Sequence, residues 1–205
     1  MLRKLGFTMI ELLIVIAVLG ILAVAVLAAI NPIEQINRGR DTGSRSDAEQ
    51  LISAIDRYYA SKGYYPWMIG ANSINTSTST ATPPVFVELD GAATVGGDGE
   101  DMLANLSTGG ASELKATFVS RVEDPATNRL SIFNDGVSSS STYVCFVPKS
   151  SAFRNEAWER CGTDEHDGLD PSLPGDFPAA ACPDTNTCAS AETADAATDC
   201  YVCLP

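Results

Sequence analysis

The sequence contains little of what an enzyme needs. It has a single histidine, His166. It contains no Walker phosphate-binding loop, dinucleotide-binding fingerprint, HExxH zinc motif or GxSxG nucleophile elbow. A Ser-His-Asp triad around His166 would therefore have no nucleophile motif to support it. We see no case for an enzyme and expect no cofactor.

Basic residues are also scarce. The 205 residues include 26 acidic and only 13 basic side chains, which gives a net charge of −13. Such a balance argues against a surface that binds nucleic acid directly. The length suffices for one domain of ordinary size in addition to any membrane helix.

The start of the chain has almost no charge over a long stretch. Residues 7–30 are apolar except for one ionisable side chain, Glu11. As a helix this run would be roughly 36 Å long, enough to cross a hydrocarbon core of about 30 Å. Arg3 and Lys4 precede it, so the positive-inside rule predicts a cytoplasmic N-terminus and a translocated remainder. The run is too long for a secretory signal peptide.

A carboxylate inside such a run is costly and marks a functional residue, unless Glu11 only reaches the headgroups. It is part of residues 6–16, which read GFTMIELLIVI. This segment resembles the processing and methylation motif of type IV pilins and type II secretion pseudopilins. The resemblance implies that a membrane peptidase removes the leader 1–6 by cutting between Gly6 and Phe7. It also implies that the same enzyme methylates the amine of Phe7.

The physical chemistry of the segment agrees with this resemblance. Cleavage would leave a cationic amine on Phe7, and Glu11 is four residues on, on the same helical face. Opposite charges attract strongly in a low dielectric, whereas either one alone is expensive to bury. The family implies that Glu11 pairs with the terminal amine of a neighbouring subunit during assembly. Gly6 has no Cβ, which lets a protease approach the backbone closely.

A second helical segment is expected at residues 32–62. Asn31-Pro32 should end or kink the first helix, and Gly39 and Gly43 favour a break at 39–45. Ser46 then begins a capping box. An apolar stripe at helical spacing follows, with a polar face opposite it. The stripe consists of Ala48, Leu51, Ile52, Ile55, Tyr58 and Tyr59, and the polar face of Asp47, Gln50, Asp56, Arg57 and Lys62. Gly63 is the expected C-cap.

A globular head is expected over residues 63–205. Residues 63–115 read as a connecting region with a short strand or apolar plug at 85–89 and a short helix near 100–107. Three β-like runs at 116–122, 129–134 and 142–147 predict an antiparallel meander over 116–147, covered by the helix at 46–62. The fold class is therefore α+β. By resemblance it is a pilin fold: a long N-terminal helix, half transmembrane and half amphipathic, packed on a small sheet.

All six cysteines lie in the last third of the chain: Cys145, Cys161, Cys182, Cys188, Cys200 and Cys203. An even number in a translocated domain predicts disulfides, with 15 connectivities open. Zinc ligation by Cys182–Cys188 and Cys200–Cys203 is a weaker alternative, and a redox pair at Cys200–Cys203 is weaker still. By resemblance, residues 148–205 are the variable C-terminal region that disulfides pin to the sheet.

Other sites are weaker. Asp164, Asp167 and Asp170 lie in the densest acidic cluster and form a weak calcium candidate, against the simpler reading of a solvated loop. Asn75 and Asn105 match the N-glycosylation pattern, with a plain exposed loop as the alternative.

By resemblance, the protein is a pilin that polymerises through its N-terminal helix into an extracellular type IV pilus-like filament for adhesion, twitching motility or DNA uptake. The implied partners are further copies, a prepilin peptidase/N-methyltransferase, an inner-membrane assembly platform and minor pilins. Before assembly it would be a single-pass protein of the cytoplasmic membrane. The alternatives are a pseudopilin of a secretion or competence machine, and a membrane-anchored binding domain that never polymerises. Six cysteines and a long C-terminal region favour the pilin.

Overall fold

The computed structural model describes residues 7–29, 31–68, 86–89, 102–108, 112–124, 130–136, 140–161, 172–182 and 200–205. The chain divides into two compact units, Met1–Ile36 and Asn37–Pro205. The first unit contains helix α1, Met9–Ala29. Its side chains are exposed from Phe7 to Leu27, and its stretch Met9–Leu27 is long and apolar enough to cross a membrane.

Helix α2, Pro32–Lys62, begins where the sequence predicted an end or kink. Proline suits the first helical position, because its missing N–H would have no partner there. The expected break at 39–45 does not occur, and Ser46 lies inside a continuous helix. Each glycine costs about 1 kcal/mol, and burial of the later apolar turns offsets this cost. The helix ends at Gly63, whose φ is 77° and whose N–H donates to the carbonyl of Tyr59 at 2.8 Å.

The stripe of α2 is largely as predicted. Ala48, Leu51, Ile55 and Tyr58 are buried, Ile52 is half-buried, and Tyr59 is exposed. One assignment to the polar face was wrong, because the side chain of Asp47 is only 7% exposed. An aspartate can lie on this face because it has a charged partner, described below.

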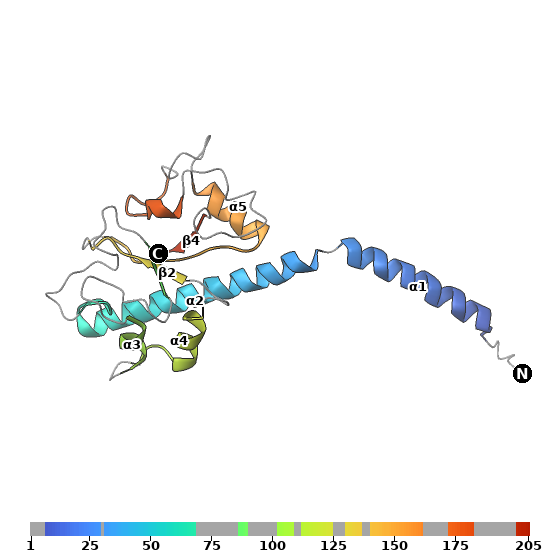
Figure 1. Ribbon diagram of the computed structural model, residues 1–205, viewed down its shortest axis with the longest axis horizontal. Helices are drawn as coiled ribbons and strands as arrows, with labels where there is room; N and C mark the ends of the chain where they lie inside the picture. The colour runs from blue at the N-terminus through green and yellow to red at the C-terminus, as the bar shows by residue number, and fades with distance from the viewer. Residues whose placement is uncertain are drawn as a thin grey trace, which may run out of the picture. The chain divides into compact units, whose positions relative to one another are not determined.

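The sheet has four antiparallel strands in the order β1-β2-β3-β4 (Figure 1). They are β1 (Val87–Glu88), β2 (Leu130–Phe133), β3 (Tyr143–Phe146) and β4 (Val202–Leu204). The hairpin of β2 and β3 and the short strand at β1 match the sequence prediction. β4 was not predicted, because three residues give too short a pattern.

The first strand of the predicted meander was wrong. Residues 116–122 form helix α4, Ala116–Val122, beside the predicted short helix α3, Met102–Ser107. Phe118 and Val122 are buried one helical turn apart. The run is rich in β-branched and aromatic residues, and that composition outweighed the spacing in the prediction. Helix α5, Ser151–Glu159, lies in the C-terminal region 148–205, where the sequence analysis predicted no helix.

Both faces of the sheet are covered, so every residue of β2 and β3 is buried. Leu130, Ile132, Val144, Phe146 and Val202 pack in one core with the stripe of α2. The alternate residues form a second core with the C-terminal segment around a short 3₁₀ helix, Ala179–Ala181. The expected α+β architecture, with a small antiparallel sheet and disulfides near the C-terminus, is confirmed.

Two disulfides join described cysteines, Cys145–Cys203 in the second core and Cys161–Cys182 in the first. Cys145 is bonded to Cys203, its direct partner across β3 and β4, and Cys161 is bonded to Cys182. Cys200 is disulfide-bonded as well, while Cys188 lies outside the described residues. The zinc alternative for both pairs and the redox alternative for Cys200–Cys203 are wrong, because Cys182 and Cys203 are bonded to cysteines earlier in the chain.

Candidate functional site

The first turn of α1 is closed by a reciprocal capping box between Thr8 and Glu11. The Glu11 carboxylate accepts from the backbone N–H of Thr8 at 2.9 Å and from its hydroxyl at 2.7 Å. In return, the backbone N–H of Glu11 donates to the Thr8 hydroxyl at 3.3 Å. This arrangement satisfies N–H groups that a helix start leaves unpaired. Sequence reasoning missed Thr8, although the T-x-x-E spacing was there to find it.

The capping box also holds the Glu11 carboxylate at the very start of the helix. Both bonds go to Oε2, so among the described residues Oε1 accepts no hydrogen bond. The carboxylate therefore retains the capacity to accept from a further donor, such as an amine. Phe7, the terminus that the sequence predicts after processing, is 81% exposed. Gly6 lies outside the described residues.

Beyond this turn, α1 is apolar on all sides and nothing within the described chain covers it. Its large side chains from Ile10 to Leu27 are between 46% and 71% exposed, and Met9 before them is 84% exposed. A helix that is apolar all round is buried in a membrane or in a larger protein core.

Comparison with known proteins agrees with this geometry. A family model described as "Prokaryotic N-terminal methylation motif" matches residues 1–27. The chain carries that methylation motif. Two sequences of the type IV major pilin protein PilE1 from Neisseria gonorrhoeae are each 39% identical over 79 residues, which is 38% of this chain. The match spans 43% and 39% of those pilins, less than half of their length. No solved structure matches.

Further along the sequence than the methylation motif, a buried carboxylate holds the head to α2. Asp41 is 1% exposed and accepts from the backbone N–H groups of Lys149 and Ser150, at 2.9 and 2.7 Å, and from the Ser150 hydroxyl at 2.5 Å. Ser150 is the N-cap of α5, and its hydroxyl accepts from the N–H of Phe153. A negative charge beside a helix N-terminus is favourable, so Asp41 fixes the start of α5 on α2.

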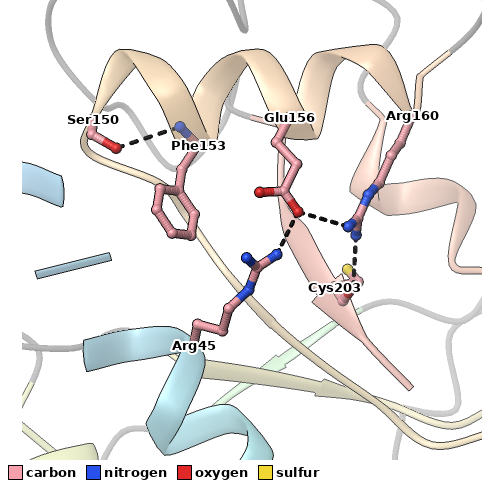
Figure 2. Close-up of polar contacts among 6 residues, drawn as sticks. All are labelled: Arg45, Ser150, Phe153, Glu156, Arg160 and Cys203. Atoms are coloured by element: carbon pink, nitrogen blue, oxygen red, sulfur yellow. Dashed lines mark hydrogen bonds and ion pairs between the residues drawn. The ribbon is translucent and has the colours of Figure 1, made fainter. Parts of the chain in front are cut away.

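A second set of contacts fixes the rest of α5 (Figure 2). One oxygen of Glu156 forms ion pairs with Arg45 of α2 and with Arg160, the latter at 2.8 Å. Arg160 also donates to the main-chain carbonyl of Cys203 at 2.9 Å. The Arg45 guanidinium lies 5.1 Å from the ring centre of Phe153. This network joins α2, α5 and β4.

Helix α4 is held to α2 by the ion pair that explains the burial of Asp47. Arg121 donates to the Asp47 carboxylate at 2.5 Å, and its guanidinium lies 5.3 Å from the ring centre of Phe118. The pair joins residues 74 positions apart. No local sequence pattern could have revealed it.

The outer layer of the sheet contains a tyrosine–aspartate pair. The Tyr143 hydroxyl donates to Asp176 at 3.0 Å, and the backbone N–H of Ser141 donates to the same carboxylate at 2.6 Å. The Ser141 N–H, with a smaller contribution from the Tyr143 hydroxyl, lowers the pKa of Asp176. Burial, followed by the hydrogen bond and charge of Asp176, raises the pKa of Tyr143 to about 12.

The remaining predicted sites separate into two groups. Asp164, Asp167, Asp170, His166 and Asn75 lie outside the described residues. Within the described ranges, no three His, Cys, Asp or Glu side chains are grouped to hold a metal. Asn105 is half-buried, and its amide nitrogen donates to the carbonyl of Pro66 at 2.9 Å. Because that nitrogen is engaged inside the folded head, Asn105 is a poor acceptor for a glycan.

Proposed function

We propose that this chain is a pilin, a structural subunit that is cut between Gly6 and Phe7, methylated at Phe7 and polymerised through α1 into an extracellular filament. The observation that carries the proposal is the methylation motif at residues 1–27 on a helix whose apolar side chains are exposed all round. Before assembly, α1 crosses the cytoplasmic membrane with its N-terminus in the cytoplasm. No catalytic role is proposed for the head.

Polymerisation follows from what must cover α1. Burying one large apolar side chain is worth about 1.5–3 kcal/mol, and α1 presents such side chains on every face. Once the helix leaves the lipid, α1 helices of other copies are the apolar surface available to it. When α1 leaves the membrane and enters the filament, it then exchanges one apolar environment, the lipid, for another, the helices of other copies.

Glu11 adds a requirement for register between the copies. Its free Oε1 can accept from the methylated amine of Phe7 in a neighbour that is shifted by about one helical turn, roughly 6 Å. In a dry filament core, an amine without a carboxylate is a buried unpaired charge. Removing one member of a buried pair costs about 3–5 kcal/mol.

The partners of the process are a prepilin peptidase/N-methyltransferase, an inner-membrane assembly platform and minor pilins. Adhesion, twitching motility or DNA uptake are the roles such a filament would serve. The second candidate is a pseudopilin of a secretion or competence machine, which uses the same assembly chemistry. The disulfide-bonded C-terminal layer favours the pilin. If the chain were a membrane-anchored domain that never polymerises, Glu11 would have no role other than its hydrogen bonds in the capping box.

The test combines intact mass with filament yield. We expect the extracellular form to begin at Phe7 with one added methyl group, and Glu11→Ala to be processed normally but to yield few or no sheared filaments. Glu159→Ala, an exposed glutamate of α5, is the matched control and should yield filaments normally. A mature chain beginning at Met1 or after Ala29, or wild-type filament yield from Glu11→Ala, would contradict the proposal.

A further inference from the structure

Basic residues are concentrated at the end of the head where the chain enters it. The head unit begins at Asn37, whose amide donates to the carbonyl of Lys149 at 3.4 Å, and Asp41 accepts from the N–H of Lys149. These contacts join residues 37–45 of α2 to residues 149–156. The joined segments, called the basic end below, contain two acidic residues and five basic ones: Arg38, Arg40, Arg45, Lys149 and Arg154. The whole chain has the opposite balance, with a net charge of −13.

Both acidic residues of the basic end are engaged inside the head. Asp41 is buried, and its carboxylate accepts three hydrogen bonds. Glu156 forms ion pairs with Arg45 and Arg160. Among the described residues, no ion pair or hydrogen bond involves the side chains of the other four basic residues, which are Arg38, Arg40, Lys149 and Arg154. The basic end therefore keeps an uncancelled positive charge.

The arginines of α2 lie on both sides of the contact with residues 149–156. The face of α2 that makes this contact is centred between Asn37 and Asp41. With 3.6 residues per turn, Arg38 and Arg40 each lie about 80° from its middle, in opposite directions. Both arginines are exposed, and the main chain of Lys149 lies on the face between them. Positive charge therefore surrounds this part of the head instead of lying on one side of it.

The length of the chain keeps the basic end near any membrane that α1 crosses. The three steps from Ala29 to Pro32 span at most about 11 Å, and the helix from Pro32 to Arg38 adds about 9 Å. Arg38 is therefore within about 20 Å of the end of α1 at any angle between the helices, and Glu34 is the one acidic residue in between. Headgroups extend about 5–8 Å beyond the hydrocarbon, and their charge acts over about 8 Å more at physiological salt. A long arginine side chain can span the rest.

We propose that the basic end docks on the headgroups of anionic phospholipids while α1 spans the membrane. The inference rests on the proposed function, because it takes α1 as a membrane span. Lipid phosphates supply the negative charge and the acceptor oxygens that guanidinium groups bind well. Each cation near such a surface favours docking about fivefold. The acidic remainder of the head is repelled by the same surface, so docking also orients the head with its basic end toward the lipid.

Energy transfer from the head to labelled lipid tests the inference on the full chain. The chain is reconstituted in vesicles of phosphatidylcholine alone or of an equal mixture with phosphatidylglycerol, which is anionic. A dansyl-labelled lipid accepts energy from Trp67 and Trp158, which both pack in the head core. We expect stronger transfer in the anionic vesicles. The difference should disappear in 1 M salt, where the Debye length is about 3 Å.

Substitutions locate the docking surface. Arg38→Gln with Arg40→Gln should lower the ratio of docked to undocked heads about 25-fold, so that transfer in anionic vesicles approaches that in neutral ones. Lys62→Gln with Lys115→Gln is the matched control, because it removes the same charge from exposed positions and Lys62 is about 36 Å along α2 from Arg38. The control should match wild type. Arg38→Lys with Arg40→Lys keeps the charge and should retain the transfer.

The outcomes separate this inference from the proposed function. Equal transfer in both kinds of vesicle, or a loss for Arg38→Gln with Arg40→Gln no greater than in the control, would overturn the inference. The pilin assignment would then stand, since intact mass and filament yield test it separately. If alkaline carbonate extracts the wild-type chain from the vesicles, α1 is no membrane span and both fail. If the two substitutions weaken binding to duplex DNA and leave the transfer unchanged, the basic end is a nucleic-acid site and the inference is wrong.

Discussion

Replacing Asp41 should strongly destabilise the head, although Asp41 is a polar residue of α2. The carboxylate accepts from two backbone N–H groups and one hydroxyl, and its side chain is almost completely buried. Asp41→Ala leaves the N–H groups of Lys149 and Ser150 without an acceptor, and each buried unpaired donor costs about 1–3 kcal/mol. We expect a total loss of about 3–5 kcal/mol, a large part of the 5–15 kcal/mol typical of domains.

Graded substitutions sharpen this prediction. Asp41→Asn keeps one acceptor oxygen but turns an amide N–H₂ toward a donor, so we expect it to lose about 2–3 kcal/mol. Ser150→Ala removes the hydroxyl and the N-cap of α5 and should cost about 1 kcal/mol. The double change Asp41→Ala with Ser150→Ala should cost less than the sum of the two, because the residues share one network.

The measurement is guanidinium unfolding of the full chain in non-ionic detergent with its disulfides intact. Fluorescence of Trp67 and Trp158, which both pack in the head core, reports the transition. Asp56→Ala is the matched control, since it removes an exposed aspartate from the same helix and should change stability by less than about 0.5 kcal/mol. A loss for Asp41→Ala no greater than that of Asp56→Ala would refute the role assigned to Asp41.

Three further predictions concern the cysteines and the outer layer of the sheet. If the protein is exported as proposed, alkylation of the extracellular form without reductant should label almost no cysteine, and labelling of several of the six would refute the disulfides. The pKa of Asp176 is lowered in the folded head, so this carboxylate stabilises the head at a pH above its ordinary pKa near 3.9. The stabilisation is lost as the pH falls through the pKa of the folded state. Asp176→Asn should therefore remove this part of the acid sensitivity in thermal melts at graded pH. The pKa of Tyr143 is raised instead, so its contribution to the stability of the head is lost as the pH rises through about 12. Tyr143→Phe should abolish the last step of a tyrosinate absorbance titration.

Patterns that repeat along the chain could be predicted from the sequence. The apolar run that became α1 and the stripe of Ala48, Leu51 and Ile55 depend only on local spacing. The pair β2–β3 is close in sequence, so turn residues revealed it. Residues 116–122 were mispredicted because β-branched composition and helical spacing conflict within only seven residues. The break at 39–45 was mispredicted because glycine propensity takes no account of tertiary contacts, such as those of Asp41 with Lys149 and Ser150 within this segment.

The polar contacts of the head were beyond the reach of the sequence. Asp41 and Ser150 are 109 residues apart, and no periodicity relates them. A hint did exist, since Asp41 falls seven residues before Ala48 on the buried face of α2. At the N-terminus the order is reversed. The sequence predicts Glu11 and Phe7 as site residues, and their roles stay predictions; the structure adds Thr8, whose N–H and hydroxyl hold the Glu11 carboxylate.

If the chain is exported as proposed, the order of its cysteines has a consequence for how the disulfides form. The bond between Cys145 and Cys203 encloses the bond between Cys161 and Cys182. A chain that emerges N-terminus first shows Cys145 and the open edge of β3 long before β4 arrives. The separation of 58 residues corresponds to roughly 3–12 seconds of synthesis. During that interval Cys161 is the first thiol that Cys145 can meet. Reaching the nested pairs therefore requires that Cys145 stays reduced until Cys203 appears, or that an early bond is exchanged by a thiol–disulfide isomerase.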